Sequence, residues 1–451
     1  MNKINLLAPK KVEYVSQVGV EAWLEDFTQQ SSFACFDALT FEFLASLSSL
    51  LMKDKRFNSV PELVALGFWL RKPNLDRKIQ EGISTSNIEA NADAKPKTTS
   101  KPLGTVVHFS PANVDTMFIY SWLASVLLGN KNIVRVASHE SQSKILLLTL
   151  LNELFAEAKY AKIAERNIFI GYDKHSDFSM RLSKIADARM IWGGDQSVAL
   201  IKGNPCKASC RDFCFSDKYS IAVLTQAELY TEPRKIANLL WRDTQAFQQQ
   251  ACSSPRVLFV IDDDIHDLSN TKRHKPVASN KEQSIEALLS DLNVMALADK
   301  NDWAQNNRAN EHLVSIQSLA ARKLITQRDQ IVQLRNVSAI KLKALSSDLL
   351  DYHTGNGLFY IRRIGSIDEL FTELSTCSPD KLQTIAISNL VNEIVENRAS
   401  ELAESPVQTL LQRLSEELQH RNFRIQALGQ ALDFSFHWDG YALLSELTNV
   451  E

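Results

Sequence analysis

Apolar residues recur at helical spacing through the first part of the chain. Between Val12 and Phe68 they fall three or four positions apart, as they do from Phe41 to Leu51. This period is typical of amphipathic helices that pack one face against a core. We therefore expect residues 1–77 to form a helical segment that packs on the domain that follows.

The next stretch, from Lys78 to Pro102, is polar and contains few apolar residues. A segment of this composition buries too little apolar surface to become ordered by itself. We expect residues 78–102 to form a linker or an arm used in oligomerisation.

After this stretch, short β-branched runs alternate with long amphipathic segments. The expected strands are residues 105–109, 133–136 and 168–170, and the helices between them are residues 115–128 and 141–159. This alternation predicts a Rossmann-like parallel sheet with crossover helices. Ligands of such sheets bind beyond the carboxyl ends of the strands, so the residues directly after each strand are candidates for a site.

The alternation continues through the rest of the chain. A helix from Pro233 to Gln249 leads to Cys252. The other expected elements are a mostly helical region at residues 282–324 and strands at 190–192, 219–224, 257–261, 330–334, 358–362 and 382–387. The predicted fold class is therefore α/β. It comprises a cofactor domain at residues 103–224, a second α/β domain at 225–420 that carries Cys252, and a C-terminal segment at 421–451 that returns to the core.

The composition is that of an ordinary globular protein. The 451 residues include 50 basic and 53 acidic side chains, and 45% are apolar. This balance indicates neither a disordered chain nor a nucleic-acid-binding protein. The longest apolar stretch, residues 117–128, is shorter than the roughly 20 residues of a membrane span. The first residues lack the apolar region of a signal peptide, so we expect a cytoplasmic protein.

Six cysteines in a chain of this length do not form a disulfide framework. Cys206, Cys210 and Cys214 are spaced by four residues, which leaves a metal site as one interpretation. No histidine lies near them and no Cys-x-x-Cys pair occurs, whereas most structural zinc sites use such ligands. We therefore favour small buried or half-buried thiols around a helix-to-strand turn and expect no metal.

A polar segment follows the first expected strand directly: Ser110-Pro111-Ala112-Asn113. A side-chain amide at the carboxyl end of a strand can donate a hydrogen bond to a developing oxyanion. The alternative is that Asn113 caps the helix that begins near Asp115. His108, within the strand, is either a proton shuttle or a structural residue, and its place in the strand favours the structural role.

Two further segments are suited to a nucleotide. The second strand ends in Arg135 and is followed by Ser138, a cation and a hydroxyl where a ribose or phosphate would lie, although such residues are also common at solvated strand ends. In Trp192-Gly193-Gly194-Asp195, two glycines at a strand-to-helix turn allow the backbone to approach a pyrophosphate closely. The usual Gly-x-Gly-x-x-Gly pattern is absent from the sequence.

Cys252 lies between a long expected helix and a strand and is followed by Ser253-Ser254-Pro255. Such a sequence predicts a tight turn that presents the thiol and its backbone N–H to a substrate. An inert thiol is the alternative, because most single cysteines are not reactive.

Taken together, these segments resemble the acyl-CoA reductases of the LuxC family. Members of this family are similar to aldehyde dehydrogenases and supply aldehyde in the bacterial luciferase operon. The segments that carry the resemblance are residues 61–71, 108–114, 129–138, 191–195, 251–256 and 438–441, in the family's order. The resemblance covers most of the chain.

The resemblance implies that Cys252 accepts the acyl group and that Asn113, with the backbone N–H of Cys252, forms the oxyanion hole. It implies that Arg135 contacts the adenosine ribose. Ser138 falls where NAD-preferring aldehyde dehydrogenases carry a glutamate, so we expect NADPH in preference to NADH. The other cofactor-binding residues that it implies are Ser110, Pro111, Gly193, Gly194 and Asp195.

The chain departs from the wider aldehyde dehydrogenase pattern at one position. Hydrolytic members carry Glu-Leu-Gly-Gly-Lys, in which the glutamate activates water. Matching that lysine to Lys218 puts Cys214 in the place of the glutamate. Without a general base there, the acyl-enzyme is expected to be reduced and not hydrolysed.

The function expected from the resemblance is reduction of a fatty acyl thioester, acyl-CoA or acyl-protein, to an aldehyde with NADPH through an acyl-cysteine. One alternative is an aldehyde dehydrogenase that works in the oxidative direction. Another is a catalytically idle scaffold for acyl-protein synthetase and acyltransferase partners. By analogy with aldehyde dehydrogenases we expect a homo-oligomer, with a homodimer as the first choice.

Overall fold

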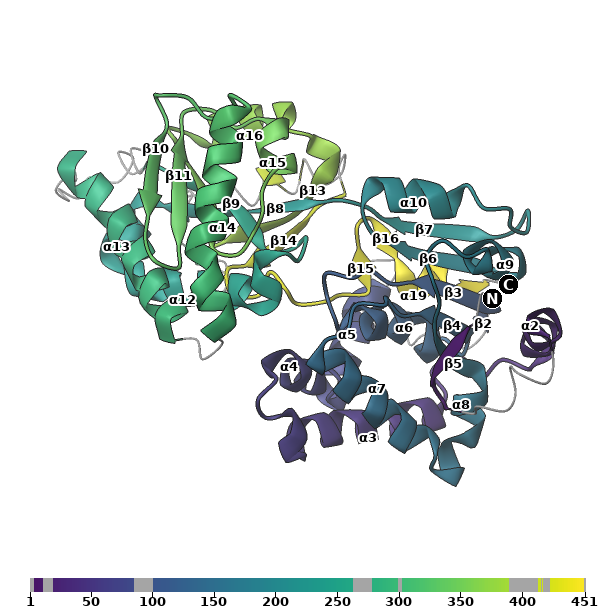
Figure 1. Ribbon diagram of the computed structural model, residues 1–451. Helices are drawn as coiled ribbons and strands as arrows, with labels where there is room; N and C mark the ends of the chain where they lie inside the picture. Colours follow the sequence, from purple (N-terminus) through teal and green to yellow (C-terminus); the bar gives the residue numbers. More distant parts are fainter. Residues whose placement is uncertain are drawn as a thin grey trace. The chain divides into compact units, whose positions relative to one another are not determined.

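The computed structural model describes residues 4–10, 19–84, 100–262, 278–298, 302–388, 413–414, 416 and 422–449. The chain divides into two compact units, which we call unit 1 (Met1–Asp217 with Phe434–Glu451) and unit 2 (Lys218–Asp433) (Figure 1). Each unit has its own central sheet and its own buried cores. No helix among the described residues is long and apolar enough to cross a membrane.

Unit 1 is built on a six-stranded sheet with the order β1-β5-β4-β3-β6-β7. The strands are β1 (Asn5–Ala8), β3 (Thr105–Phe109), β4 (Lys131–Arg135), β5 (Asn167–Gly171), β6 (Ala188–Trp192) and β7 (Arg211–Phe215). All neighbours are parallel except β1, which is antiparallel to β5. Side chains alternate between two cores, as in β3, where Val106 faces one core and Val107 the other. Both faces are therefore buried, as the β-branched runs predict.

Helices cover both faces of this sheet (Figure 1). The first core takes side chains from α3 (Ala38–Lys53), η1 (Lys55–Phe57), α4 (Pro61–Trp69), α5 (Lys72–Ser84), α6 (Met117–Leu127), α7 (Gln142–Phe155), η2 (Ala158–Tyr160) and α8 (Ala161–Arg166). The second takes them from α2 (Val20–Gln29), α9 (Phe178–Ile185) and α10 (Asp195–Lys202).

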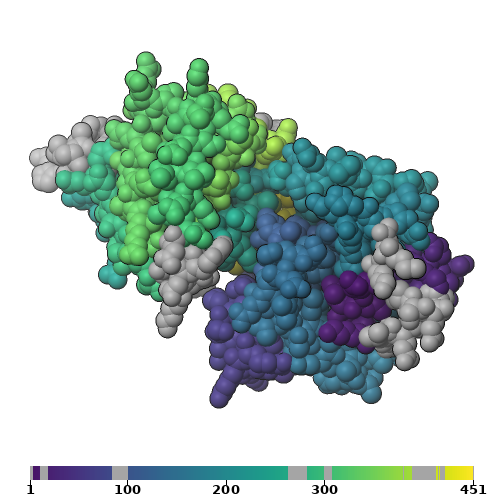
Figure 2. Space-filling model, in the orientation of Figure 1, coloured from purple at the N-terminus to yellow at the C-terminus, as the bar shows by residue number. Residues whose placement is uncertain are grey.

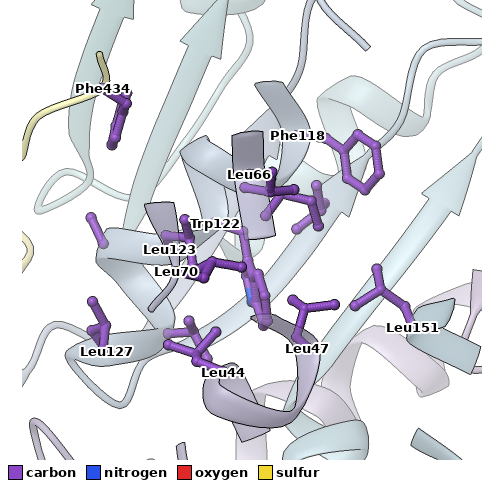
Figure 3. Close-up of a cluster of buried hydrophobic side chains, with 14 of the residues drawn as sticks. Leu44, Leu47, Leu66, Leu70, Phe118, Trp122, Leu123, Leu127, Leu151 and Phe434 are labelled. Atoms are coloured by element: carbon purple, nitrogen blue, oxygen red, sulfur yellow. The ribbon is translucent and has the colours of Figure 1, made fainter. Parts of the chain in front are cut away.

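The N-terminal helices pack directly on the sheet layer of unit 1. Trp122 of α6 is fully buried, and it lies among Leu44 and Leu47 of α3 and Leu66 of α4 (Figure 3). The leucines on α3 fall three or four residues apart on one face, as the sequence pattern predicts. The purple and dark blue N-terminal residues also form part of the surface of unit 1 (Figure 2).

Unit 2 is built on a seven-stranded sheet with the order β10-β11-β12-β9-β8-β13-β14. The strands are β8 (Tyr219–Thr225), β9 (Pro255–Ile261), β10 (Gln330–Gln333), β11 (Ser338–Leu342), β12 (Leu358–Ile364), β13 (Leu382–Ile387) and β14 (Arg424–Ala427). All neighbours are parallel except the edge strand β10. Among the described residues, the helices of unit 2 include α11 (Gln226–Thr231), α12 (Pro233–Gln245), η3 (Ala246–Gln249), α13 (Ala278–Ala298), α14 (Asp302–Ala321), α15 (Ser347–Asp351), α16 (Ile367–Thr376) and η5 (Pro379–Lys381).

The C-terminal residues of unit 1 form short elements. These are β15 (His437–Trp438), β16 (Tyr441–Ala442), α19 (Leu443–Glu446) and β17 (Thr448–Asn449), which pairs with β2 (Lys101–Pro102). The return to the core thus begins at Phe434 and not at residue 421, because β14 pairs with β13 in the sheet of unit 2.

Two further predicted boundaries differ from the structure. Strand β8 pairs with β9 and β13, so the boundary between the units lies after Asp217 and not near Thr225. The continuous apolar run in β8 fits either sheet, and its pairing cannot be seen in the sequence. Helix α5 extends to Ser84, beyond the predicted start of the linker at Lys78, because Ile79 on its inner face is buried in the core. The rest of the predicted linker, residues 85–99, lies outside the described residues.

Candidate active site

The sheet order of unit 1 reverses at β3. From β3 the chain continues through β4 and β5 on one side and through β6 and β7 on the other. Ser110, Pro111 and Asn113 follow β3 directly, and Gly193 and Gly194 follow β6. Ligands of open parallel sheets bind at this switch point, beyond the carboxyl ends of the strands. The structure therefore brings the predicted residues of unit 1 to one edge of its sheet.

The segments after β3 and β4 are tied to each other. The backbone N–H of Ser110 donates to the carbonyl of Arg135 at 3.2 Å, and the Ser110 hydroxyl donates to the same oxygen. In return, Nη1 of Arg135 lies 3.4 Å from the Ser110 carbonyl. The guanidinium also lies over the Tyr172 ring, 5.7 Å from its centroid. These contacts fix the orientation of the Arg135 side chain. Ser138, three residues further along the chain, is exposed.

Lys144 is a further cation at this edge. It lies in the first turn of α7, and its Nζ donates to the carbonyl of Ala137 at 2.9 Å, next to Ser138. Burial lowers the pKa of Lys144, and the carboxylates of Asp115 and Glu140 partly offset this. Lys144 was not among the residues predicted from the sequence, although it lies in the first turn of the helix that follows β4.

The Gly193-Gly194 turn leads into α10 in close contact with a carboxylate. The N–H of Asp195 donates to Oδ2 of Asp217 at 3.1 Å, and the N–H of Asp217 donates to Oδ1 of Asp195 at 3.2 Å. A Cβ on Gly194 would lie 3.2 Å from Oδ2 of Asp217, so the close approach favours glycine. The Asp217 carboxylate already occupies part of the helix N-terminus where we expected a pyrophosphate.

Asn113 is exposed in the segment between β3 and α6. Helix α6 begins at Met117, and its N-cap residue is Thr116. The alternative that Asn113 caps this helix is therefore excluded. Its proposed role as an oxyanion donor remains a prediction.

His108 lies inside unit 1 and not at the exposed edge. Its side chain is fully buried, with Nδ1 2.8 Å from Oγ of Ser121 and Nε2 3.0 Å from Oδ1 of Asn132. Trp192 donates its indole N–H to the same Ser121 hydroxyl, so this hydroxyl can donate to Nδ1. Burial lowers the pKa of His108 to about 4. The histidine is thus a neutral structural residue.

Cys252 lies in a tight turn of unit 2. The N–H of Ser254 donates to the carbonyl of Ala251 at 3.0 Å, which places Cys252 and Ser253 at the centre of the turn. Cys252 is partly exposed, whereas its neighbours Ala251 and Ser253 are buried. The Ser220 hydroxyl donates to the Cys252 carbonyl at 2.7 Å. The turn predicted from the sequence is confirmed, and Cys252 within it is partly exposed.

This turn precedes β9 and therefore lies at the amino edge of the parallel sheet of unit 2. Ser220 opposes Pro255 in the register of β8 and β9, at a register irregularity in both neighbours of β8. Bulges of this kind redirect a side chain next to a functional segment. At this irregularity the Ser220 hydroxyl accepts from the N–H of Thr384 at 3.1 Å and donates to the Cys252 carbonyl.

Cys214 occupies the position matched to a catalytic glutamate. It lies in β7, where its N–H donates to Oη of Tyr441 at 3.2 Å. Burial raises the pKa of the Cys214 thiol, and the nearby Asp212 adds to this rise. The thiol is therefore protonated at neutral pH and does not act as a base. Lys218 donates to the carbonyl of Asp380 at 2.6 Å.

The remaining two cysteines of this group, Cys206 and Cys210, lie between α10 and β7, in the helix-to-strand turn that we expected. Cys210 is half-buried as expected, whereas Cys206 is exposed. Burial, with a contribution from the neighbouring Cys206, raises the pKa of Cys210 to about 12. Within the described residues, no group of three or more His, Cys, Asp or Glu side chains is arranged to hold a metal ion.

Solved structures similar to this one define its fold class. One is the glyceraldehyde-3-phosphate dehydrogenase GapN of Methanocaldococcus jannaschii in complex with NADP, with a TM-score of 0.56, 11% identity, and coverage of 95% of this chain and 91% of that chain. Another is an NAD-dependent benzaldehyde dehydrogenase of Corynebacterium glutamicum, with a TM-score of 0.54, 11% identity, and coverage of 95% and 86%. The two units together thus have the aldehyde dehydrogenase fold.

The sequence defines the family within that fold. A family model described as acyl-CoA reductase (LuxC) matches residues 43–285, more than half of the chain. The chain belongs to this family. It is also similar to a long-chain acyl-protein thioester reductase of Aliivibrio fischeri, with 23% identity over 167 residues, which are 37% of this chain. The matched part spans 34% of that relative's length.

Proposed function

We propose that this protein reduces fatty acyl thioesters to aldehydes through an acyl intermediate on Cys252. The observation that carries the proposal is the partly exposed Cys252 in a closed turn, in a chain of the acyl-CoA reductase family. The donor is an acyl-CoA or an acylated protein, the substrate in the name of the Aliivibrio fischeri relative.

In the proposed reaction, the Cys252 thiolate attacks the carbonyl carbon of the thioester, and the thiol of the donor leaves. The backbone N–H of Cys252 and the side-chain amide of Asn113 donate hydrogen bonds to the oxyanion. Donors held in place for a developing charge supply a large part of the rate of acyl transfer. The same donors bind the oxyanion that forms when the acyl group on Cys252 is reduced. Collapse of this oxyanion breaks the carbon–sulfur bond and releases the aldehyde.

The residues at the carboxyl edge of unit 1 fit a nicotinamide nucleotide. Arg135 and Lys144 place two cations near the exposed Ser138, and Ser138 carries no carboxylate at the position where NAD-preferring aldehyde dehydrogenases have a glutamate. This supports NADPH in preference to NADH. The carboxylates of Asp195 and Asp217 make the Gly193-Gly194 turn the less suitable phosphate site. When bound, the nicotinamide supplies the hydride that reduces the acyl group.

The state of Cys214 supports reduction over hydrolysis. A protonated thiol in the place of a glutamate cannot take a proton from water at neutral pH. The acyl-enzyme is therefore not hydrolysed before it is reduced.

The test is incubation of the protein with radiolabelled long-chain acyl-CoA, with and without NADPH. The wild type should carry a hydroxylamine-sensitive label that NADPH removes as aldehyde, and Cys252→Ala should carry none. Cys210→Ala, which removes another thiol of partial exposure, serves as the matched control and should be labelled normally. Labelling of Cys252→Ala would show that Cys252 is not the nucleophile. Oxidation of aldehyde with NAD and no CoA would favour an aldehyde dehydrogenase instead.

A further inference from the structure

The three residues of η3 that immediately precede the Cys252 turn have an unusual backbone. Phe247, Gln248 and Gln249 have φ values of 56°, 53° and 60°, in the left-handed region. Residues with side chains rarely adopt this conformation, and a run of three persists only where the surroundings hold it. Neighbouring residues must therefore hold the backbone of η3 in this conformation.

A second left-handed segment lies against it. Gly355, Asn356 and Gly357, the residues before β12, have φ values of 71°, 59° and 89°. The N–H of Asn356 donates to the carbonyl of Gln248 at 2.7 Å. A Cβ on Gly355 would lie 3.0 Å from that same carbonyl oxygen, so the close backbone contact requires glycine there. The two segments are thus joined backbone to backbone.

The Gln249 side chain connects this contact to the Cys252 turn. It is fully buried, and both ends of its amide are used. Nε2 donates to the carbonyl of Pro255 at 2.8 Å, and Oε1 accepts from the N–H of Gly357 at 2.9 Å. The first bond closes residues 249–255 into a ring that contains Cys252. The second fastens this ring to the segment before β12.

The segment before β12 is itself held from α14. His312 donates from Nε2 to the carbonyl of Asn356 at 2.8 Å, and its Nδ1 lies 2.9 Å from Oγ of Ser338. Arg308 donates from Nε to Oδ1 of Asn356 at 3.0 Å. Gln249 is therefore anchored on a part of unit 2 that is fixed by buried hydrogen bonds.

We propose that Gln249 is a positioning residue that holds the Cys252 turn, and with it the backbone N–H of Cys252, in the geometry that acyl transfer requires. This rests on the proposed role of Cys252 as the nucleophile. A displacement of about 1 Å at a reacting group costs on the order of a hundredfold in rate. Loss of the Gln249 amide leaves the Gly357 N–H and the Pro255 carbonyl without their partner, so the ring opens.

The first experiment compares Gln249→Ala with Gln245→Ala, the same substitution at an exposed glutamine four residues earlier. In Gln249→Ala, backbone hydrogen exchange over residues 250–257 should accelerate, kcat should fall about 10- to 100-fold, and KM for acyl-CoA should change less than about threefold. Gln245→Ala should match the wild type in all three. Unchanged exchange, or faster exchange with an unchanged kcat, would overturn the proposal.

A second variant, Gln249→Glu, distinguishes positioning from a general loss of structure. A protonated carboxyl group has one donor and one acceptor and can replace both bonds of the amide, whereas the ionised form cannot donate to the Pro255 carbonyl. The kcat of this variant relative to the wild type should therefore be highest at low pH and fall as the pH rises. For Gln245→Glu the same ratio should be constant. A constant ratio for Gln249→Glu would contradict the positioning role.

These results separate the two proposals. If the wild type forms no acyl-Cys252 and no aldehyde, the proposed function fails, and hydrogen exchange alone decides whether Gln249 holds the turn. If the wild type turns over and Gln249→Ala turns over equally fast, the positioning role fails while the proposed function stands.

Discussion

The two units present their candidate residues at opposite kinds of sheet edge. In unit 1 the candidates directly follow the parallel strands β3, β4 and β6, at the carboxyl edge. In unit 2, Cys252 precedes β9 and lies at the amino edge. The rule that ligands bind at carboxyl ends thus locates the candidate residues of unit 1 and would miss Cys252, the proposed nucleophile.

The two edges also differ in how their residues are held. Arg135 is the last residue of its strand, and Asn113 is only four residues from the end of another, so the strands themselves place them. The Cys252 turn depends on the side chains of Ser220 and Gln249, which bond to its backbone. Positions set by strand ends follow from local sequence, whereas positions set by such side chains depend on the folded unit.

The largest predicted effect concerns His108, the buried histidine in strand β3 of unit 1. Burial lowers the pKa of His108 to about 4, below its unfolded value of about 6.5. A depressed pKa stabilises the folded state above pH 6.5, and this stability is lost as the pH falls toward 4. The loss should reach about 3 kcal/mol near pH 4. Hydrogen exchange in β3 and β6, measured between pH 7 and 4, would show it after correction for the intrinsic exchange rate.

The variant that tests this assignment is His108→Gln. A glutamine side chain can accept from Ser121 and donate to Asn132 but does not titrate, so the acid-dependent part of the loss should shrink. His139→Gln, at an exposed histidine, should retain the wild-type pH dependence. If His108→Gln loses stability with acid as steeply as the wild type, groups other than His108 determine the acid sensitivity.

Much of unit 1 could be predicted from the sequence because its strands are short β-branched runs between amphipathic helices. The expected strand 105–109 has the bounds of β3, and the expected strands 133–136, 168–170 and 190–192 overlap β4, β5 and β6. Strand β7 was missed because its sequence, Arg211-Asp212-Phe213-Cys214-Phe215, begins with two charged residues. Edge strands often carry charged residues and therefore lack a continuous apolar signal.

The environment of Cys252 could not be predicted in the same way. The turn itself follows from local sequence, but Gln249 bonds to Gly357, which is 108 residues away. The left-handed backbone of residues 247–249 has no sequence signal either, because glycine is absent from them. Sequence therefore located the thiol, while the parts that hold it became visible only in the folded unit.

Asn113 offers the next test, from the unit 1 side of the proposed reaction. Asn113→Ala should lower kcat about a hundredfold, because an oxyanion donor acts mainly in the transition state. Labelling of Cys252 by acyl-CoA should be slowed, and the hydrogen exchange of the Cys252 turn should be unchanged. Gln249→Ala should slow the labelling of Cys252 and also accelerate the hydrogen exchange of the turn. Equal exchange in the two variants, or wild-type turnover of Asn113→Ala, would remove the distinction between a donor in unit 1 and a positioning residue in unit 2.

The smallest effect is expected at Ser138, where the exposed edge of unit 1 meets the cofactor. Ser138→Glu introduces a carboxylate beside the expected 2′-phosphate site, close to the two cations Arg135 and Lys144. The ratio of kcat/KM for NADPH to that for NADH should fall about tenfold, which corresponds to about 1.4 kcal/mol of repulsion and lost attraction. Steady-state kinetics with each nucleotide measures the ratio.

Ser197→Glu, at an exposed serine in the first turn of α10, is the control and should leave this ratio unchanged if the phosphate lies at the end of β4. If Ser197→Glu changes the ratio and Ser138→Glu does not, the phosphate lies at the Gly193-Gly194 turn, despite the two carboxylates there.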